Sequence, residues 1–225
     1  MKIVPGKLVL SEKDWEQLRS WHLELLPEVL VTFAFNYLLW REQQNKKNKD
    51  EGVDRLFDTL VGKFGEYMLW SLAKALFSEP DYSKYNNPKF DPDLLALLTN
   101  YKIHVKMCSW EMKKYCGCDG WLVSRSDPIV DMKYDHQNNI LVFGFVNEFW
   151  EVKWAGWCFV NEMYDHKRNI CYYRRTYSNK YLNRKWGVWA YAPPGGYHKG
   201  QRIYGVIEDG ILRPIEDLLT LVRSN

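Results

Sequence analysis

The sequence has few cysteines, and their spacing forms no recognisable framework. There are 5 cysteines, an odd number, and none of them shows paired C-x-x-C spacing. They are Cys108, Cys116, Cys118, Cys158 and Cys171. This pattern argues against a disulfide-stapled secreted domain and favours free thiols over a structural zinc site.

The sequence also lacks a long hydrophobic segment. Its longest apolar run, residues 29–40, is short for a membrane span and is interrupted by Thr32 and Asn36. Residues 1–5 do not have the character of a signal peptide. We therefore expect a cytoplasmic protein that does not associate with membranes.

No large excess of one charge is present, because the net charge is only +3 over 225 residues. With 46% hydrophobic and 26% charged residues, the composition excludes a disordered chain and indicates a soluble globular protein. The charge is nevertheless uneven, since residues 162–202 contain nine Lys and Arg residues against two acids. This segment is also rich in Tyr and Trp, a combination that suits a phosphate backbone. A solvated charged face is the alternative interpretation.

From this basic segment we take eight residues as candidates for nucleic-acid binding. They are Lys167, Arg168, Arg174, Arg175, Arg184, Lys185, Lys199 and Arg202.

The order of predicted elements indicates an α/β protein. Helices are expected over residues 11–25, from Pro27 through the apolar run, over residues 53–77 and over residues 214–222. From residue 121 onward most of the chain has the pattern of strands. We expect an N-terminal helical segment, residues 1–50, followed by an α/β core with a β-rich, basic C-terminal half, residues 51–225.

A short apolar hairpin carries polar residues at positions where burial would be costly. Residues 94–98 and 103–107 are predicted as two strands joined by a turn at Thr99 and Asn100. Asp93 opens the first strand, while His104 and Lys106 are two residues apart on the second and so share one face. Charged groups in such a place favour a binding site for a charged ligand.

Glu66 supplies a second acid. On the predicted helix it lies at the edge of an apolar stripe, with Gly62 and Leu69 one turn away. A helical glutamate, an aspartate at a strand start and a lysine on the next strand are the groups needed for metal-assisted phosphodiester hydrolysis. Carboxylates bind Mg²⁺ or Mn²⁺, and a lysine can orient the attacking water. A half-buried polar sheet edge is the structural alternative.

These residues resemble the motif of the PD-(D/E)XK nuclease superfamily, which includes many restriction and homing endonucleases. The matching pieces are Gly65-Glu66, Pro92-Asp93-Leu94 and Ile103-His104-Val105-Lys106. The resemblance implies a restriction-endonuclease-like mixed sheet flanked by helices and a metal-dependent DNA endonuclease that acts on duplex DNA. It also implies that Glu66 and Asp93 bind metal together with the Val105 carbonyl, and that Lys106 is the catalytic lysine.

The sequence departs from the family pattern at His104, where the family has Asp or Glu. An imidazole can bind a metal but favours Mn²⁺ over Mg²⁺ relative to a carboxylate. Three outcomes are open: His104 is a catalytic metal ligand, Glu66 takes the missing role, or the fold is catalytically inactive and only binds DNA. An RNA-directed nuclease is a further alternative. Cutting both strands of a duplex needs two active sites, so a homodimer is also expected.

Overall fold

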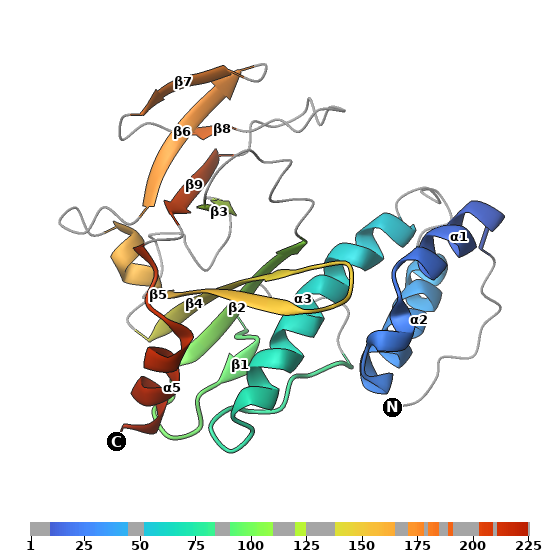
Figure 1. The fold of residues 1–225 in the computed structure, drawn as a ribbon, viewed down its shortest axis with the longest axis horizontal. Helices are drawn as coiled ribbons and strands as arrows, with labels where there is room; N and C mark the ends of the chain where they lie inside the picture. The colour runs from blue at the N-terminus through green and yellow to red at the C-terminus, as the bar shows by residue number, and fades with distance from the viewer. Residues whose placement is uncertain are drawn as a thin grey trace.

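The structure is a computed structural model that describes residues 10–44, 52–83, 91–109, 120–124, 138–164, 171–177, 180–184, 189–190, 203–208 and 211–224. Helices gather around a four-stranded sheet, and a second sheet is formed by the C-terminal half of the chain (Figure 1).

The first helix, α1 (Glu12–Ser20), begins with a capping box formed by Ser11 and Asp14. Ser11 Oγ accepts the backbone N–H of Asp14, and Asp14 Oδ2 accepts the backbone N–H of Ser11 at 2.9 Å. This exchange satisfies two N–H groups that helix geometry leaves without partners. The helix ends before the predicted residue 25, because the chain turns at His22 with φ of 50° and continues as the 3₁₀ helix η1 (Leu23–Leu25).

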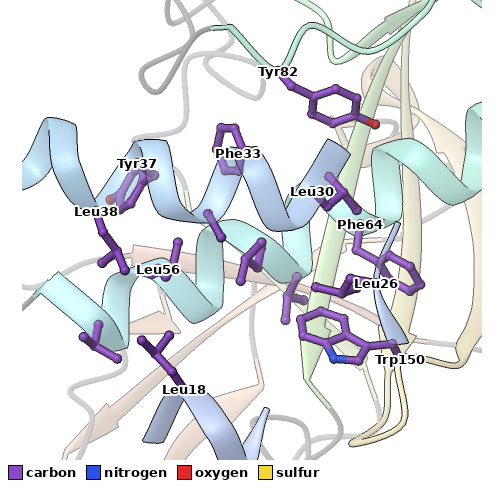
Figure 2. Packing of buried hydrophobic residues seen from close by; sticks show 14 of the residues in the cluster. Leu18, Leu26, Leu30, Phe33, Tyr37, Leu38, Leu56, Phe64, Tyr82 and Trp150 are labelled. Carbon is purple, nitrogen blue, oxygen red and sulfur yellow. The ribbon is translucent and has the colours of Figure 1, made fainter. Parts of the chain in front are cut away.

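The next two helices, α2 (Glu28–Gln44) and α3 (Gly52–Leu72), pack against each other over a hydrophobic core (Figure 2). The core also takes in Trp150, whose ring lies 5.4 Å from that of Phe64 and whose Nε1 donates to the Trp21 carbonyl at 2.6 Å. The N-terminal helices therefore share one core with α3 and with the turn that carries Trp150.

The central sheet has the strand order β1-β2-β4-β5 and is mixed, as predicted. Its strands are β1 (Leu94–Leu95), β2 (Lys102–Ser109), β4 (Asn139–Val146) and β5 (Val152–Phe159). Strands β2 and β4 are parallel, while the two outer pairs are antiparallel. The fold is thus an α/β arrangement in which helices flank a four-stranded mixed sheet.

One face of this sheet packs against α3 and α5 (Ile215–Arg223). In β2 and β4 that face carries Ile103 and Val105 beside Ile140 and Val142, and all four are buried. Helix α3 approaches β2 closely at Gly65, where an added Cβ atom would collide with the side chain of Met107. Since side chains alternate along a strand, the even-numbered residues of β2 face away from α3.

At the β5 edge of the sheet, the segment leading into α5 is tied to the strand. Trp157 and Arg213 exchange two backbone hydrogen bonds of 2.9 and 3.0 Å, and Trp157 Nε1 donates to the Pro214 carbonyl at 2.9 Å. Arg213 also forms a two-pronged ion pair with Glu162, which lies in η4 (Val160–Tyr164). Gly156, with φ of 130°, permits this approach, because a side chain there would meet the Arg213 carbonyl.

The second sheet is described through its backbone pairing. It contains β3 (Gly120–Ser124), β6 (Cys171–Tyr177), β7 (Lys180–Arg184), β8 (Trp189–Ala190) and β9 (Ile203–Glu208). The order is β3-β9-β6-β7, and β8 pairs with β9. The β-rich C-terminal half that the sequence predicts is therefore confirmed.

Two predicted boundaries near the hairpin are wrong. The first strand ends at Leu95 instead of residue 98, because the turn has already begun: Asn100 has φ of 60° and its N–H donates to the Ala96 carbonyl at 2.8 Å. Helix α3 ends at Leu72 instead of residue 77, since Phe77 is extended and forms an isolated bridge with Ala96.

Within the described ranges, no helix has both the length and the apolar character that crossing a bilayer requires.

Candidate active site at the β1 edge

Asp93 lies at the edge of the sheet, immediately before β1. Its backbone N–H donates to the Ile103 carbonyl at 3.0 Å, and its Oδ2 accepts the backbone N–H of Val105 at 2.7 Å. A strand N–H points sideways, in the plane of the sheet. The Asp93 carboxylate therefore lies at the level of the β2 backbone, between the two faces.

The Val105 carbonyl faces the same edge. In a strand, the N–H and C=O of one residue point toward the same neighbouring strand, and the Val105 N–H points toward Asp93. Strand β1 pairs with β2 only at Ile103 and Lys102, so its pairing stops before Val105. A carbonyl oxygen and a carboxylate thus occupy the position that a longer β1 would have covered.

Glu66 and Lys63 form an ion pair on α3, one helical turn apart. Lys63 Nζ lies 2.8 Å from Glu66 Oε2. Both residues are buried: Lys63 is 7% exposed and Glu66 is 6% exposed. Gly65 brings this part of α3 onto β2, so the close packing at that residue sets how near the adjacent Glu66 lies to the strand.

The surroundings of Glu66 shift its carboxyl group toward the neutral form. Burial, together with the charge of Asp93, raises the pKa of Glu66 from its ordinary value of 4.5 to about 8, while Lys63 acts in the opposite direction. Asp93 can influence Glu66 in this way only because the two carboxylates are close. Glu66 therefore holds its proton at neutral pH, and a bound divalent cation would compete with that proton for the carboxylate.

His104 and Lys106 lie on the other face of β2. Val105 and Met107 face Gly65 of α3, so the residues that alternate with them point away from that helix. His104 is 1% exposed, and its Nε2 lies 2.9 Å from Asn139 Oδ1 on the neighbouring strand. Lys106 is half-buried. The structure thus gathers Glu66, Asp93 and Val105 at one edge and directs His104 toward Asn139.

Two further residues belong to this environment and were missed by sequence reasoning. Lys63 could have been found from its i,i+3 spacing to Glu66, which places both on one helix face. Tyr82 gave no signal, because it lies in an irregular segment after α3. Burial, followed by the charge of Glu66, raises the pKa of its hydroxyl, and its ring packs 6.4 Å from that of Phe33.

The candidate nucleic-acid-binding residues fall partly outside the described residues. Lys167, Arg168, Lys185, Lys199 and Arg202 lie outside them. Arg174 and Arg175 are in β6 and Arg184 is in β7, where Arg174 and Arg184 are direct cross-strand partners. The register therefore sets two cationic residues opposite each other.

The donors at the β1 edge fit a hard divalent cation. Glu66 and Asp93 supply carboxylate oxygens and Val105 a carbonyl oxygen, which are the ligand types that Mg²⁺ and Mn²⁺ prefer. Among the residues that the structure describes, no three His, Cys, Asp or Glu side chains lie close enough together to hold a metal. Two carboxylates are nevertheless sufficient for a cation that keeps several waters and binds substrate phosphate.

No protein-family model, curated protein or solved structure shows significant similarity to the chain.

Proposed function

We propose that this chain is a metal-dependent endonuclease that hydrolyses phosphodiester bonds of duplex DNA, on a restriction-endonuclease-like fold. The observation that carries the proposal is the placement of the Asp93 carboxylate against the Val105 backbone, with the charge of Asp93 acting on buried Glu66. These residues come from three separate parts of the chain. They are also the positions that the nuclease motif requires in this order along the sequence.

Each residue has a definite role in the proposed reaction. Asp93 and Glu66 hold Mg²⁺ or Mn²⁺, and the Val105 carbonyl completes the set of protein ligands. The cation, when bound, polarises the scissile phosphate and lowers the pKa of water. Lys106 orients the attacking water and offsets the negative charge that grows on the phosphate. Lys106 lies on the face of β2 that turns away from α3, because it alternates with Val105 and Met107, which face Gly65.

Charged residues at the second sheet support a nucleic-acid substrate. Arg174 and Arg184 are directly opposed in the register of β6 and β7. A cluster of cationic residues suits a phosphate backbone as its partner.

The direct test incubates purified protein with a long DNA duplex, in parallel with single-stranded DNA and RNA, in Mg²⁺, in Mn²⁺ and in EDTA. The proposal expects discrete or progressive cleavage of the duplex that depends on the cation. Intact duplex in both metals, with the protein shown to be folded, would contradict it. Preferred cleavage of RNA would support an RNA-directed nuclease instead.

Lys106 can be tested against a matched lysine on the same strand. Lys106→Ala removes a group used mainly in the transition state, so cleavage should be abolished while DNA affinity is retained. Lys102→Ala removes an exposed lysine four residues earlier and should leave cleavage unchanged. Normal cleavage by the Lys106 variant would remove this residue from the mechanism.

A catalytically inactive DNA-binding module is the second candidate. The observation that favours it is the contact between His104 and Asn139, because the position of the family's second acid carries an imidazole that points away from α3. Binding of duplex with salt dependence, and without cleavage in either metal, would identify this function.

A further inference from the structure

Lys63 is a lysine that the fold buries beside an acid. It is 7% exposed, and its Nζ donates to Glu66 Oε2 at 2.8 Å. Lysine is rarely buried in proteins unless its charge is paired. Replacing a buried ion pair by apolar side chains of similar size is often neutral or stabilising. Packing alone therefore does not account for a charged pair at this place.

Contacts of α3 with β2 connect this pair to the β1 edge. An added Cβ atom at Gly65, the residue before Glu66, would lie 3.2 Å from Val105 Cγ1. The backbone N–H of Val105 donates in turn to Asp93 Oδ2 at 2.7 Å. Lys63 thus lies on the part of the helix that packs against the strand residue bound by Asp93.

Lys106 lies on the other side of this strand. Val105 faces Gly65, and side chains alternate along a strand, so Lys106 turns away from α3. Glu66, the helical acid, instead has the Lys63 ammonium group in direct contact. The α3 side of the site therefore has a positive charge of its own, which the nuclease-like motif does not include.

We propose that Lys63 is a second cationic group of the hydrolysis: it pairs with Glu66 before the divalent cation binds, and it moves to the scissile phosphate when the cation takes the Glu66 carboxylate. The inference rests on the proposed function, because it requires both a cation and a phosphodiester at the β1 edge. An ammonium group and a divalent cation repel each other at a few ångströms, so Glu66 does not keep both on the same oxygen. A phosphate oxygen is the anionic partner that the substrate brings with it.

The ammonium group acts by its charge and keeps its own protons. During hydrolysis the oxygen of the attacking water bonds to phosphorus and gives up a proton to solvent, while the ester oxygen leaves with the bonding electrons and takes up a proton. Negative charge grows on the phosphate oxygens between these events, and a cation held there lowers the barrier. Removing one such stabilising group from an enzyme typically lowers kcat about 10²–10³-fold.

The proposal predicts two opposite effects of Lys63→Met. The variant keeps the apolar stem and loses the charge, so Mn²⁺ should bind about tenfold more tightly in the absence of DNA. Cleavage of duplex DNA at saturating Mn²⁺ should nevertheless fall roughly a hundredfold in kcat, with the KM for DNA changed by less than about threefold. Lys63→Arg, which retains the charge, should recover most of the cleavage rate.

The experiment uses the full chain. Titration calorimetry gives the Mn²⁺ dissociation constants, steady-state cleavage gives kcat and KM, and melting in EDTA shows whether each variant is folded. Lys63→Gln, which is neutral but still able to donate to Glu66, replaces the Met variant if the latter melts below the assay temperature. Lys74→Met, at an exposed lysine of the segment after α3, is the matched control and should change neither Mn²⁺ affinity nor kcat.

The outcomes separate the role of Lys63 from the proposed function. Tighter Mn²⁺ binding together with a low kcat supports the movement of Lys63 from Glu66 to the phosphate. A normal kcat in the neutral variant, beside a wild type that cleaves, would overturn this role and leave the nuclease assignment intact. Weaker Mn²⁺ binding would also overturn it, because Lys63 would then only hold Glu66 in place. A wild type that cleaves no DNA in either metal would overturn the proposed function, and the role of Lys63 with it.

Discussion

The two edges of the four-stranded sheet are finished in opposite ways. At the β5 edge, Trp157 and Arg213 exchange two backbone hydrogen bonds, and the Arg213 guanidinium pairs with Glu162 while lying 4.8 Å from the centre of the Trp157 ring. At the β1 edge, the strand pairing stops early and a backbone N–H is satisfied by the carboxylate of Asp93. One edge is closed by a salt bridge and an exchange of backbone hydrogen bonds, and the other ends in acidic side chains. Under the proposed function, the first edge serves stability and the second serves chemistry.

The largest effect that separates the edges is expected from Asp93→Asn. Asparagine keeps an oxygen that can accept the Val105 N–H, so the free energy of unfolding should change by less than about 1 kcal/mol. The lost charge should weaken binding of the cation. It should also lower the cleavage rate roughly a hundredfold or more, which corresponds to about 3 kcal/mol of transition-state stabilisation. Cleavage assays in Mn²⁺ and urea unfolding check both parts. A variant that loses much of its stability but still cleaves DNA would reverse the assignment of the two edges.

The second effect is a dependence of stability on pH at the β1 edge. The pKa of Glu66 is about 8 in the folded protein, against an ordinary value of 4.5. The stability that goes with protonated Glu66 is fully present below about pH 4.5 and is lost as the pH rises through about 8. In EDTA, the wild type should therefore lose stability relative to Glu66→Gln across this window, on the order of a few kcal/mol. Urea unfolding measures the free energy of unfolding of both proteins at each pH. If the two free energies change with pH in the same way, the prediction is wrong.

At the β5 edge, Arg213→Ala should cost stability without touching the chemistry. It leaves Glu162, which is mostly buried, without its cationic partner, and we expect a loss of about 2 kcal/mol in the free energy of unfolding. Mn²⁺ affinity should stay at the wild-type value. Arg223→Ala, at an exposed arginine of α5, is the matched control and should change stability by less than about 0.5 kcal/mol. Equal losses in the two variants would mean that the β5 edge is not specially stabilised.

The smallest expected effect is a gain. Lys63→Met keeps the apolar stem but removes the ammonium group that competes with a cation for Glu66. Opposed charges a few ångströms apart near a protein surface interact by about 1–4 kcal/mol, so Mn²⁺ affinity should rise about tenfold. Lys74→Met, at an exposed lysine of the segment following α3, should have no effect. Weaker Mn²⁺ binding in the Lys63 variant would show that this lysine positions Glu66 instead of competing for it.

The parts of the β1 edge that could be predicted from the sequence are those with local signals. The hairpin was visible from two apolar runs around a turn, and Asp93 reaches Val105 across only 12 residues. Glu66 was recognised as an acid at the margin of an apolar helix face, and its burial agrees with that reading. The turn at Asn100 began earlier than the run of leucines suggested, because Leu97 and Leu98 are exposed residues of the turn and not strand residues.

The parts that could not be predicted depend on distant segments. The partner of His104 is Asn139, 35 residues away, and only the parallel register of β2 and β4 brings them together. His104 alternates with Val105 and Met107, which face Gly65 of α3, so it lies on the face of the sheet away from that helix. Tyr82 packs against Phe33 because the segment after α3 folds back onto the helices, and no periodicity in the sequence reports this.

The difference in sequence separation has a consequence for the order of folding. The pair Lys63–Glu66 spans three residues and the contact of Asp93 with Val105 spans 12, so both can form from short chain segments at little loop-closure cost. The pairing of β2 with β4 must instead close a loop of more than 30 residues. Strand pairing across such a large sequence separation is slow. The hairpin of β1 and β2 would then form before β4 is in place, and the apolar face of β2 would stay uncovered until β4 pairs with it.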